Sequence, residues 1–141
     1  MIEEDDPRLG KAFSRDEIVA AIGAVCRARG VAFHVDAVQS AAFAPPTPDA
    51  WQATLVSLSA HKLYGPKGAG ALYVRQGTAM LPQSSGGAQE RQRRAGTENV
   101  PAIVGFAAAM RLASAEPMDL VPLRDRLIVG VTALSGVTLT G

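Results

Sequence analysis

The sequence has little of several features that would place a protein outside the ordinary globular class. Its single cysteine, Cys26, cannot form an internal disulfide, so a reducing cytoplasm is the simplest compartment. No apolar stretch reaches the length that spans a bilayer, and the acidic residues 3–6 are the reverse of a secretory signal peptide. The formal net charge of +1 gives no electrostatic case for binding nucleic acid or an anionic membrane.

Aromatic residues are also scarce, at 5%, whereas apolar residues as a whole make up 48% and charged residues 19%. With 141 residues, the chain is long enough for one domain with a real core. The 14 glycines and the shortage of large rings favour close packing of helices on a sheet.

Helical and strand patterns alternate along the chain. Ser14 and Glu17 form a capping box that opens a helix, and Gly30 ends this helix. Strands are expected at residues 31–36, 54–58, 70–74 and 137–139, and helices at 101–114 and 122–134. This alternation predicts an α/β fold with a mainly parallel sheet and packed helices.

The predicted sheet is small for the elements around it. No strand pattern precedes the first helix, and a new strand begins just before Gly141. A sheet of so few strands would leave an exposed edge and an uncovered face. We therefore expect the sequence to be a piece of a larger protein.

The most informative residue is Lys62, which comes just past the end of the apolar strand at residues 54–58. In open α/β sheets, ligands bind beyond the carboxyl ends of strands. A lysine held there, partly desolvated, can lose its proton and attack a carbonyl to form a Schiff base. The ordinary alternative is a surface lysine in a loop.

Asp36 ends a second buried strand and supplies a carboxylate at an equivalent place. Pyridoxal phosphate (PLP) enzymes need a lysine for the imine and a carboxylate facing the pyridinium nitrogen. Gln39 could point into the same pocket and hydrogen-bond the cofactor ring. The alternatives are a turn cap for Asp36 and plain solvent exposure for Gln39. His34, on the same strand, is interpreted as a packing residue.

Two groups of residues are candidates for holding a phosphate. Ser59 and His61 flank the lysine with a hydroxyl and an imidazole, although a turn-capping serine and a loop histidine are the ordinary alternatives. Thr97 follows an arginine-rich polar loop and lies at an expected helix start, where free N–H groups favour an anion. A solvated charge run is the alternative for that loop.

Two further features are interpreted as structural, with no catalytic or binding role. The glycine-rich residues 65–70 lack the Lys-Ser/Thr pair of a Walker phosphate loop, so they indicate a turn that returns the chain to a strand. Cys26 is interpreted as a buried structural thiol. We expect no metal site.

Three blocks of the sequence, taken together, resemble the cysteine desulfurases, which are PLP enzymes of the class V aminotransferase group. The order and spacing of the blocks agree with that family, and the resemblance covers residues 14–141. It implies part of a fold-type I large domain over residues 1–117 and the beginning of a small C-terminal domain over 118–141. The blocks are His34-Val35-Asp36-Ala37-Val38-Gln39-Ser40, Ser59-Ala60-His61-Lys62-Leu63-Tyr64-Gly65-Pro66-Lys67-Gly68 and Arg93-Arg94-Ala95-Gly96-Thr97-Glu98-Asn99.

The resemblance implies a catalytic lysine and two contacts to the cofactor ring. Lys62 would form the imine with PLP and, once freed by the substrate, would move protons. Asp36 would pair with the pyridinium nitrogen, and Gln39 would contact the ring hydroxyl.

The resemblance also implies three phosphate contacts and a homodimer. Ser59 and His61 would hold the phosphate of the chain's own cofactor. Thr97 would reach the phosphate of the neighbouring subunit's cofactor, which makes the family's site dimeric.

The implied activity converts L-cysteine to L-alanine and passes the sulfur as a persulfide to an iron–sulfur scaffold or another acceptor. In the family, the persulfide forms on a cysteine located beyond the point where this sequence ends, and Cys26 does not match it. We therefore expect the chain alone to be inactive. Two alternatives remain: another class V enzyme, such as a selenocysteine lyase or an aminotransferase, and a non-catalytic remnant that pairs with a full-length subunit.

Overall fold

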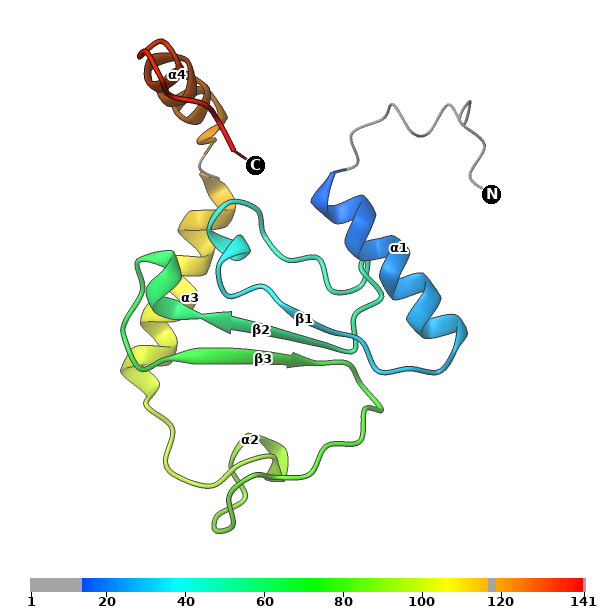
Figure 1. Ribbon diagram of the computed structural model, residues 1–141. Coiled ribbons are helices and arrows are strands. Elements are labelled where there is room, and N and C mark those ends of the chain that lie inside the picture. The colour runs from blue at the N-terminus through cyan, green and yellow to red at the C-terminus, as the bar shows by residue number, and fades with distance from the viewer. Residues whose placement is uncertain (1–13, 117–118, 141) are drawn as a thin grey trace.

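The computed structural model describes residues 14–116 and 119–140. Its centre is a small sheet with the strand order β1-β2-β3 (Figure 1). Strand β1 (His34–Asp36) runs parallel to β2 (Leu55–Ser59), and β3 (Gly70–Val74) runs antiparallel to β2. The α/β class expected from the sequence is confirmed.

The described sheet is mixed, which corrects the expectation of a mainly parallel one. The reason is the short connection between β2 and β3 over residues 60–69. Parallel neighbours need a crossover of roughly a dozen residues or more, usually a helix, whereas a short connection returns the chain antiparallel. The connection between β1 and β2 is longer and permits the parallel pair.

Helix α1 (Arg15–Ala28) begins as the sequence predicts. The Ser14 Oγ accepts the Glu17 N–H at 3.2 Å, and the Glu17 carboxylate accepts the Ser14 N–H at 2.8 Å, which completes the capping box. Gly30 follows the helix with a φ of +64°, a left-handed conformation that favours glycine. A Cβ at Gly23 would overlap the carbonyl oxygen of Trp51, so this glycine lets α1 lie close to the chain before β2.

The core consists of two clusters. One lies between α1 and one face of the sheet, around the fully buried side chains of Trp51 and Val56. The other lies between helix α3 (Val100–Ala115) and two short 3-10 turns, η1 (Ser40–Ala42) and η2 (Ala60–Leu63), which follow β1 and β2. Its members are Ala41, Ala42, Ala60, Leu63, Phe106 and Ala109.

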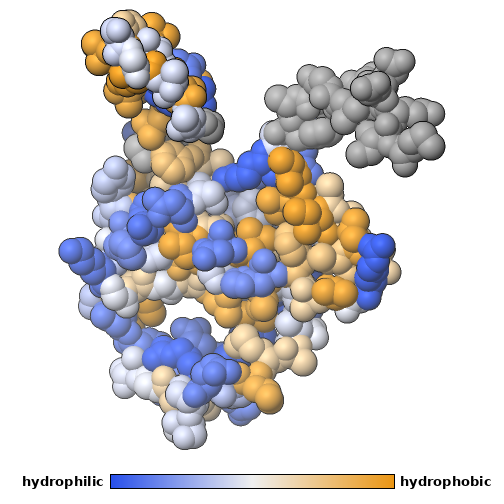
Figure 2. Space-filling view, viewed as in Figure 1, coloured by the Kyte–Doolittle hydropathy of each residue, from blue (hydrophilic) through white to orange (hydrophobic). Residues whose placement is uncertain are grey.

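The opposite face of the sheet is open to solvent. His34 and Asp36 of β1 are exposed on it, and Leu72 of β3 is 46% exposed. This agrees with the uncovered face expected for a sheet of so few strands. Large hydrophobic residues are exposed elsewhere too, including Ile18, Ile22 and Val25 on α1. Figure 2 shows the hydrophobic surface over α1 and over α4.

The expected helix at residues 122–134 is present as α4 (Val121–Thr132), which stands apart from the sheet beyond the end of α3 (Figure 1). The expected strand at residues 137–139 is wrong: these residues are irregular. A strand needs a neighbour to accept its backbone hydrogen bonds, and the described part of the chain offers none there. Within that same part, no helix is both long and apolar enough to cross a bilayer.

Candidate functional site at the carboxyl ends of two strands

The parallel pair β1 and β2 brings the candidate residues to one edge of the sheet. Asp36, the last residue of β1, is aligned with Ser57 of β2, and Ser59 ends β2 two residues later. Successive side chains alternate between the faces of a strand. Val35 and Val56 therefore face the core, and Asp36, Ser57 and Ser59 face the open side.

Asp36 is exposed, and its Oδ1 accepts the N–H of Val38 at 3.0 Å. The carboxylate thus closes the turn after β1, as the alternative interpretation expected. Among the described residues, no donor reaches its other oxygen, Oδ2. Gln39 lies in this turn, is exposed, and makes no capping bond to η1. Turn closure therefore leaves one carboxylate oxygen and one amide for a ligand.

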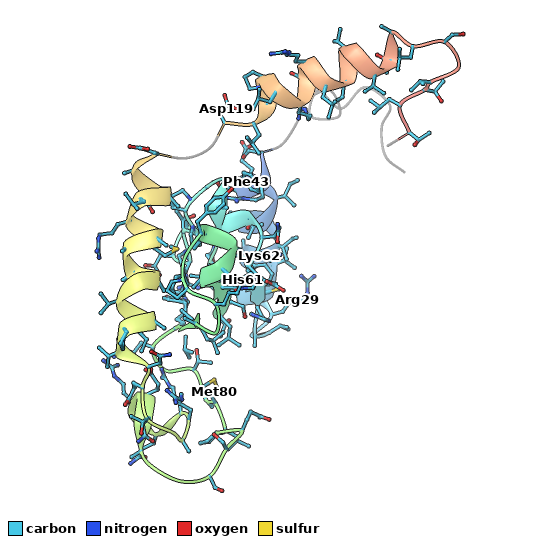
Figure 3. The ribbon with its side chains drawn as sticks, turned by 90° about the vertical axis from the view of Figure 1, so that its left-hand side faces the viewer. Arg29, Phe43, His61, Lys62, Met80 and Asp119 are labelled. Carbon is cyan, nitrogen blue, oxygen red and sulfur yellow. The ribbon has the colours of Figure 1, made fainter. Side chains whose placement is uncertain are left out.

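Ser59 and His61 form a hydrogen-bonded pair, with 2.9 Å between Oγ and Nδ1. His61 and Lys62 lie next to each other in η2, beside α3 (Figure 3). Lys62 is exposed, and in the described part of the chain its amine has no hydrogen bond or ion pair. The expected partial desolvation of Lys62 is thus not seen, because no side chain of the described residues covers the amine.

The turn that carries Lys62 packs closely against α3. Leu63 is buried in the cluster beneath α3. A Cβ at Gly65 would lie 3.2 Å from the Cβ of Ala109 on α3, and a Cβ at Gly105 of α3 would lie 2.6 Å from the ring of Pro66. Small residues therefore let α3 approach the turn closely. The glycine-rich segment returns the chain to β3, as expected.

Thr97 lies in a loop before α3 and is exposed. The expectation that Thr97 stands at the helix start is wrong, because α3 begins at Val100 and Asn99 is its N-cap. The Asn99 Oδ1 accepts the Ala102 N–H at 3.2 Å, so a side chain of the chain itself occupies that cap.

The arginine-rich loop is partly braced and partly strained, which the sequence did not reveal. Arg94 donates to the carbonyl oxygens of Ala95 at 3.1 Å, Gly96 at 2.7 Å and Thr97 at 3.5 Å, so its guanidinium is bound to the loop itself. The short helix α2 (Gln89–Gln92) contains Glu90, Arg91 and Gln92 with positive φ. Such conformations cost roughly 1 kcal/mol or more each for residues other than glycine.

One further polar pair was missed by the sequence interpretation. The Nε2 of His34 lies 2.7 Å from the Oγ of Ser57 on the open face. His34 is exposed, so its interpretation as a packing residue is wrong. The signal was present: in the sequence His34-Val35-Asp36, strand alternation places the histidine on the same face as the aspartate.

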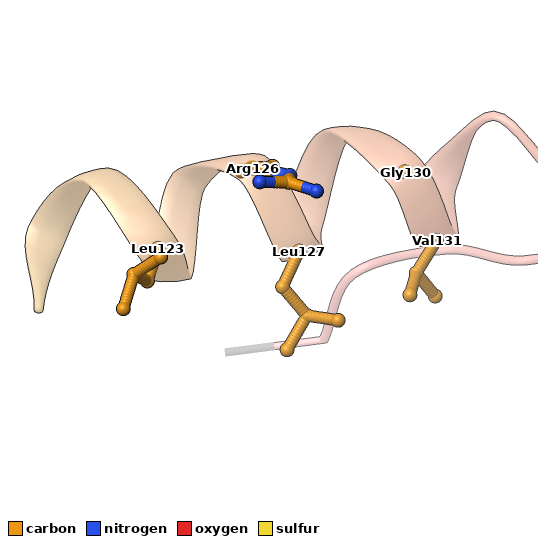
Figure 4. A pocket seen from close by; sticks show the side chains of 5 residues that line it. All are labelled: Leu123, Arg126, Leu127, Gly130 and Val131. Carbon is orange, nitrogen blue, oxygen red and sulfur yellow. The ribbon is translucent and has the colours of Figure 1, made fainter.

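Two hollows on the surface lie away from these residues. A groove of about 580 Å³ runs between α3 and the back of the lysine turn, and its lining is mainly apolar, with Tyr64 and Glu116 as polar members. A shallow pocket on α4 is formed by one helix face, with Leu123, Leu127 and Val131 as its apolar part (Figure 4). None of the candidate site residues lines either hollow.

The strands thus place a carboxylate and a lysine-bearing turn at the carboxyl edge of an α/β sheet, which is where ligands bind in open α/β folds. The comparisons agree. The aminotransferase class-V family matches residues 17–125. Cysteine desulfurase IscS of Methanosarcina thermophila is 42% identical over 99% of this chain and 37% of its own length. The enzyme of the same name from Anaeromyxobacter sp. is 50% identical over 79% of this chain and 29% of its own.

Solved structures show the same fold. The NifS-like protein from Rickettsia africae superposes with a TM-score of 0.79 at 30% identity, over 85% of this chain and 34% of its own. SspA in complex with cysteine gives a TM-score of 0.67 at 35% identity, over 79% of this chain and 33% of its own. The chain belongs to the class-V aminotransferase family. It spans about a third of the length of the curated relatives it matches.

Proposed function

We propose that the chain carries the lysine side of the cofactor pocket of a PLP-dependent cysteine desulfurase. The observation that supports this most is the grouping of Asp36, the Ser59–His61 pair and Lys62 at the shared edge of β1 and β2. The relatives named cysteine desulfurase point to the same activity. The substrate is then L-cysteine, consistent with the relative solved in complex with cysteine.

The polar groups on the open face fit PLP. A carboxylate with one uncommitted oxygen suits a protonated ring nitrogen, and an uncovered amine suits an aldehyde. Asp36 would face the ring nitrogen, Gln39 the ring hydroxyl, and Lys62 would hold the cofactor covalently. PLP, when bound, supplies an electron sink for charge at the substrate's α-carbon.

The remaining roles are phosphate binding, by Ser59 and His61, and proton transfer, by Lys62. The hydroxyl of Ser59 would donate to the phosphate, and the imidazole of His61 would donate through Nδ1 to that hydroxyl and so fix its direction. The Lys62 amine, placed on a braced turn, is the group that would move the α-proton of cysteine. An exposed Lys62 needs covering by another part of the complete protein, which would exclude water from this proton transfer.

The homodimer and the sulfur acceptor belong to the same proposal. Thr97 lies on a loop stiffened by Arg94 and is exposed, so it is available to the phosphate of a neighbouring subunit's cofactor. The sulfur would leave to an iron–sulfur scaffold or another acceptor. The division into a large domain over residues 1–117 and a small domain from 118 is also proposed, because α4 stands apart from the sheet.

A spectroscopic titration tests the proposal. On mixing with PLP, the chain should develop the absorbance of a protein-bound imine, and Lys62→Ala should remove it. Lys67→Ala is the matched control, since Lys67 is also exposed and lies in the same turn region. Equal loss in both variants, or no imine with the unsubstituted chain, would count against the lysine assignment.

The exposure of Lys62 favours a second candidate, a non-catalytic chain that pairs with a full-length desulfurase subunit. In that case, the chain would co-purify with a full-length relative without forming an imine of its own. Imine absorbance from the isolated chain mixed with PLP, with no full-length subunit present, would exclude this candidate.

A further inference from the structure

His34 forms a hydrogen bond with Ser57, which lies two residues further along β2, toward the edge that carries Asp36 and Lys62. In the parallel register, His34 is aligned with Leu55, and Asp36 is aligned with Ser57. The imidazole nevertheless reaches past its own partner to the Ser57 Oγ, 2.7 Å from Nε2. The ring therefore contacts the residue that stands across from Asp36.

Packing does not account for this histidine. His34 is exposed, whereas its neighbour Val35 packs against the core cluster around Trp51 and Val56. A side chain on the exposed face of a strand gains little from burial, which is what strand preference largely reflects. The specific feature of His34 is thus the polar contact on the open face, beside the carboxylate proposed to face the ring nitrogen.

We propose that His34 is a positioning residue of the PLP site, acting through Ser57 on Asp36; this rests on the proposed function. His34 donates its Nε2–H to the Ser57 oxygen. A hydroxyl has one proton and two acceptor sites, so this leaves the Ser57 proton for the acceptor-only carboxylate across the ladder. The Asp36 Oδ1 accepts the Val38 N–H, and no described donor reaches Oδ2 in the chain without cofactor. Ser57, which is aligned with Asp36 in the ladder, would turn its proton to Oδ2 when the ring nitrogen is bound.

The donor direction can be tested without cofactor. Nitrogen NMR of the cofactor-free chain should show His34 as the Nε2–H tautomer, with its signals identified by their loss in His34→Gln. In Ser57→Ala the tautomer preference should weaken, because the acceptor is gone. An Nδ1–H tautomer in the unsubstituted chain would mean that Ser57 donates to His34, and this would overturn the proposal.

The effect on the site is tested by comparing PLP with an analogue that carries carbon in place of the ring nitrogen. His34→Leu should weaken PLP binding about fivefold, the range of one lost hydrogen bond, and should leave the analogue unaffected. His34→Gln, which keeps an N–H donor, should restore most of the affinity. In an Asp36→Asn background, His34→Leu should add no further loss.

Leu72→Ala is the matched control, since Leu72 lies across from Ser57 on β3, is exposed on the same face and has no polar atoms. It should leave the affinity for both ligands unchanged. Equal weakening of PLP and its analogue by His34→Leu would show a merely structural role, and unchanged PLP binding would also overturn the proposal. An unsubstituted chain that binds neither ligand would overturn the proposed function itself, and this inference with it.

Discussion

The indole N–H of Trp51 donates to the carboxylate of Asp16 at 2.7 Å, across 35 residues of sequence. This bond ties the first turn of α1 to the chain that leads into β2. Trp51 is only 1% exposed, and Arg15 lies over its ring at 5.5 Å from the centroid. The contact thus anchors the helix beside the strands that carry the candidate site.

Asp16→Ala should lower the free energy of unfolding by about 1–3 kcal/mol, because it leaves the buried Trp51 N–H without an acceptor. Asp16→Asn keeps a carbonyl oxygen and should recover most of this loss. Chemical denaturation measures both. Asp125→Ala is the control: among the residues that the structure describes, Asp125 pairs with the adjacent Arg124 on α4 alone, at 2.7 Å, and its loss should cost less than about 0.5 kcal/mol. Equal effects at the two positions would contradict the assigned role of Asp16.

Gly105→Ala should disturb the turn that carries Lys62. Alanine is favoured over glycine within a helix by about 1 kcal/mol, but here its Cβ would collide with the ring of Pro66. Overpacking of this kind costs roughly 1–3 kcal/mol. Gly130→Ala on α4 meets nothing within 4 Å and should be neutral or stabilising. Thermal unfolding of the two variants separates the helix preference for alanine from the cost of the clash with Pro66. A Gly105→Ala chain as stable as the Gly130→Ala chain would show that α3 does not brace the turn.

Ser59→Ala should weaken binding of PLP by roughly 10- to 100-fold and leave binding of pyridoxal, which has no phosphate, unchanged. The reason is the loss of a hydroxyl hydrogen bond to a charged group, which contributes about 1.5–3 kcal/mol. Equilibrium dialysis with the two ligands measures the difference. Ser135→Ala, at an exposed serine after α4, is the control and should change neither affinity. Parallel losses for PLP and pyridoxal would place Ser59 outside the phosphate site.

Arg94→Ala should loosen the loop before α3, since the carbonyl oxygens of Ala95, Gly96 and Thr97 lose their donor. Amide exchange at Ala95, Gly96 and Thr97 is expected to quicken several-fold, while exchange within α3 stays slow. Arg91→Ala is the control, because Arg91 is exposed and makes no hydrogen bond among the described residues. Unchanged exchange in Arg94→Ala would mean that the backbone alone holds this loop.

Local chemistry made much of the fold predictable. The capping box at Ser14 and the strand at residues 70–74 are confirmed, since each prediction depends on neighbours in sequence. The strand expected at 137–139 failed because pairing depends on a distant partner. The sheet is less parallel than expected because of the short connection after β2.

In the candidate site too, features that depend on sequence neighbours are predictable, whereas contacts that depend on side-chain direction are not. Asp36, Ser59 and Lys62 fall at strand ends, where the sequence placed them. The predicted position of Thr97 at a helix start is wrong, because Asn99 is the N-cap of α3. The contacts of His34 with Ser57 and of Arg94 with its own loop depend on side-chain direction, which apolar periodicity does not report.

The central claim is that Lys62 is the covalent anchor of PLP. The most direct test is to mix the purified chain with PLP, reduce with borohydride and map the labelled peptide. The account predicts a pyridoxyl group on Lys62, lost in Lys62→Ala and kept in Lys67→Ala. Labelling that is absent, or scattered over Lys11, Lys62 and Lys67, would contradict it.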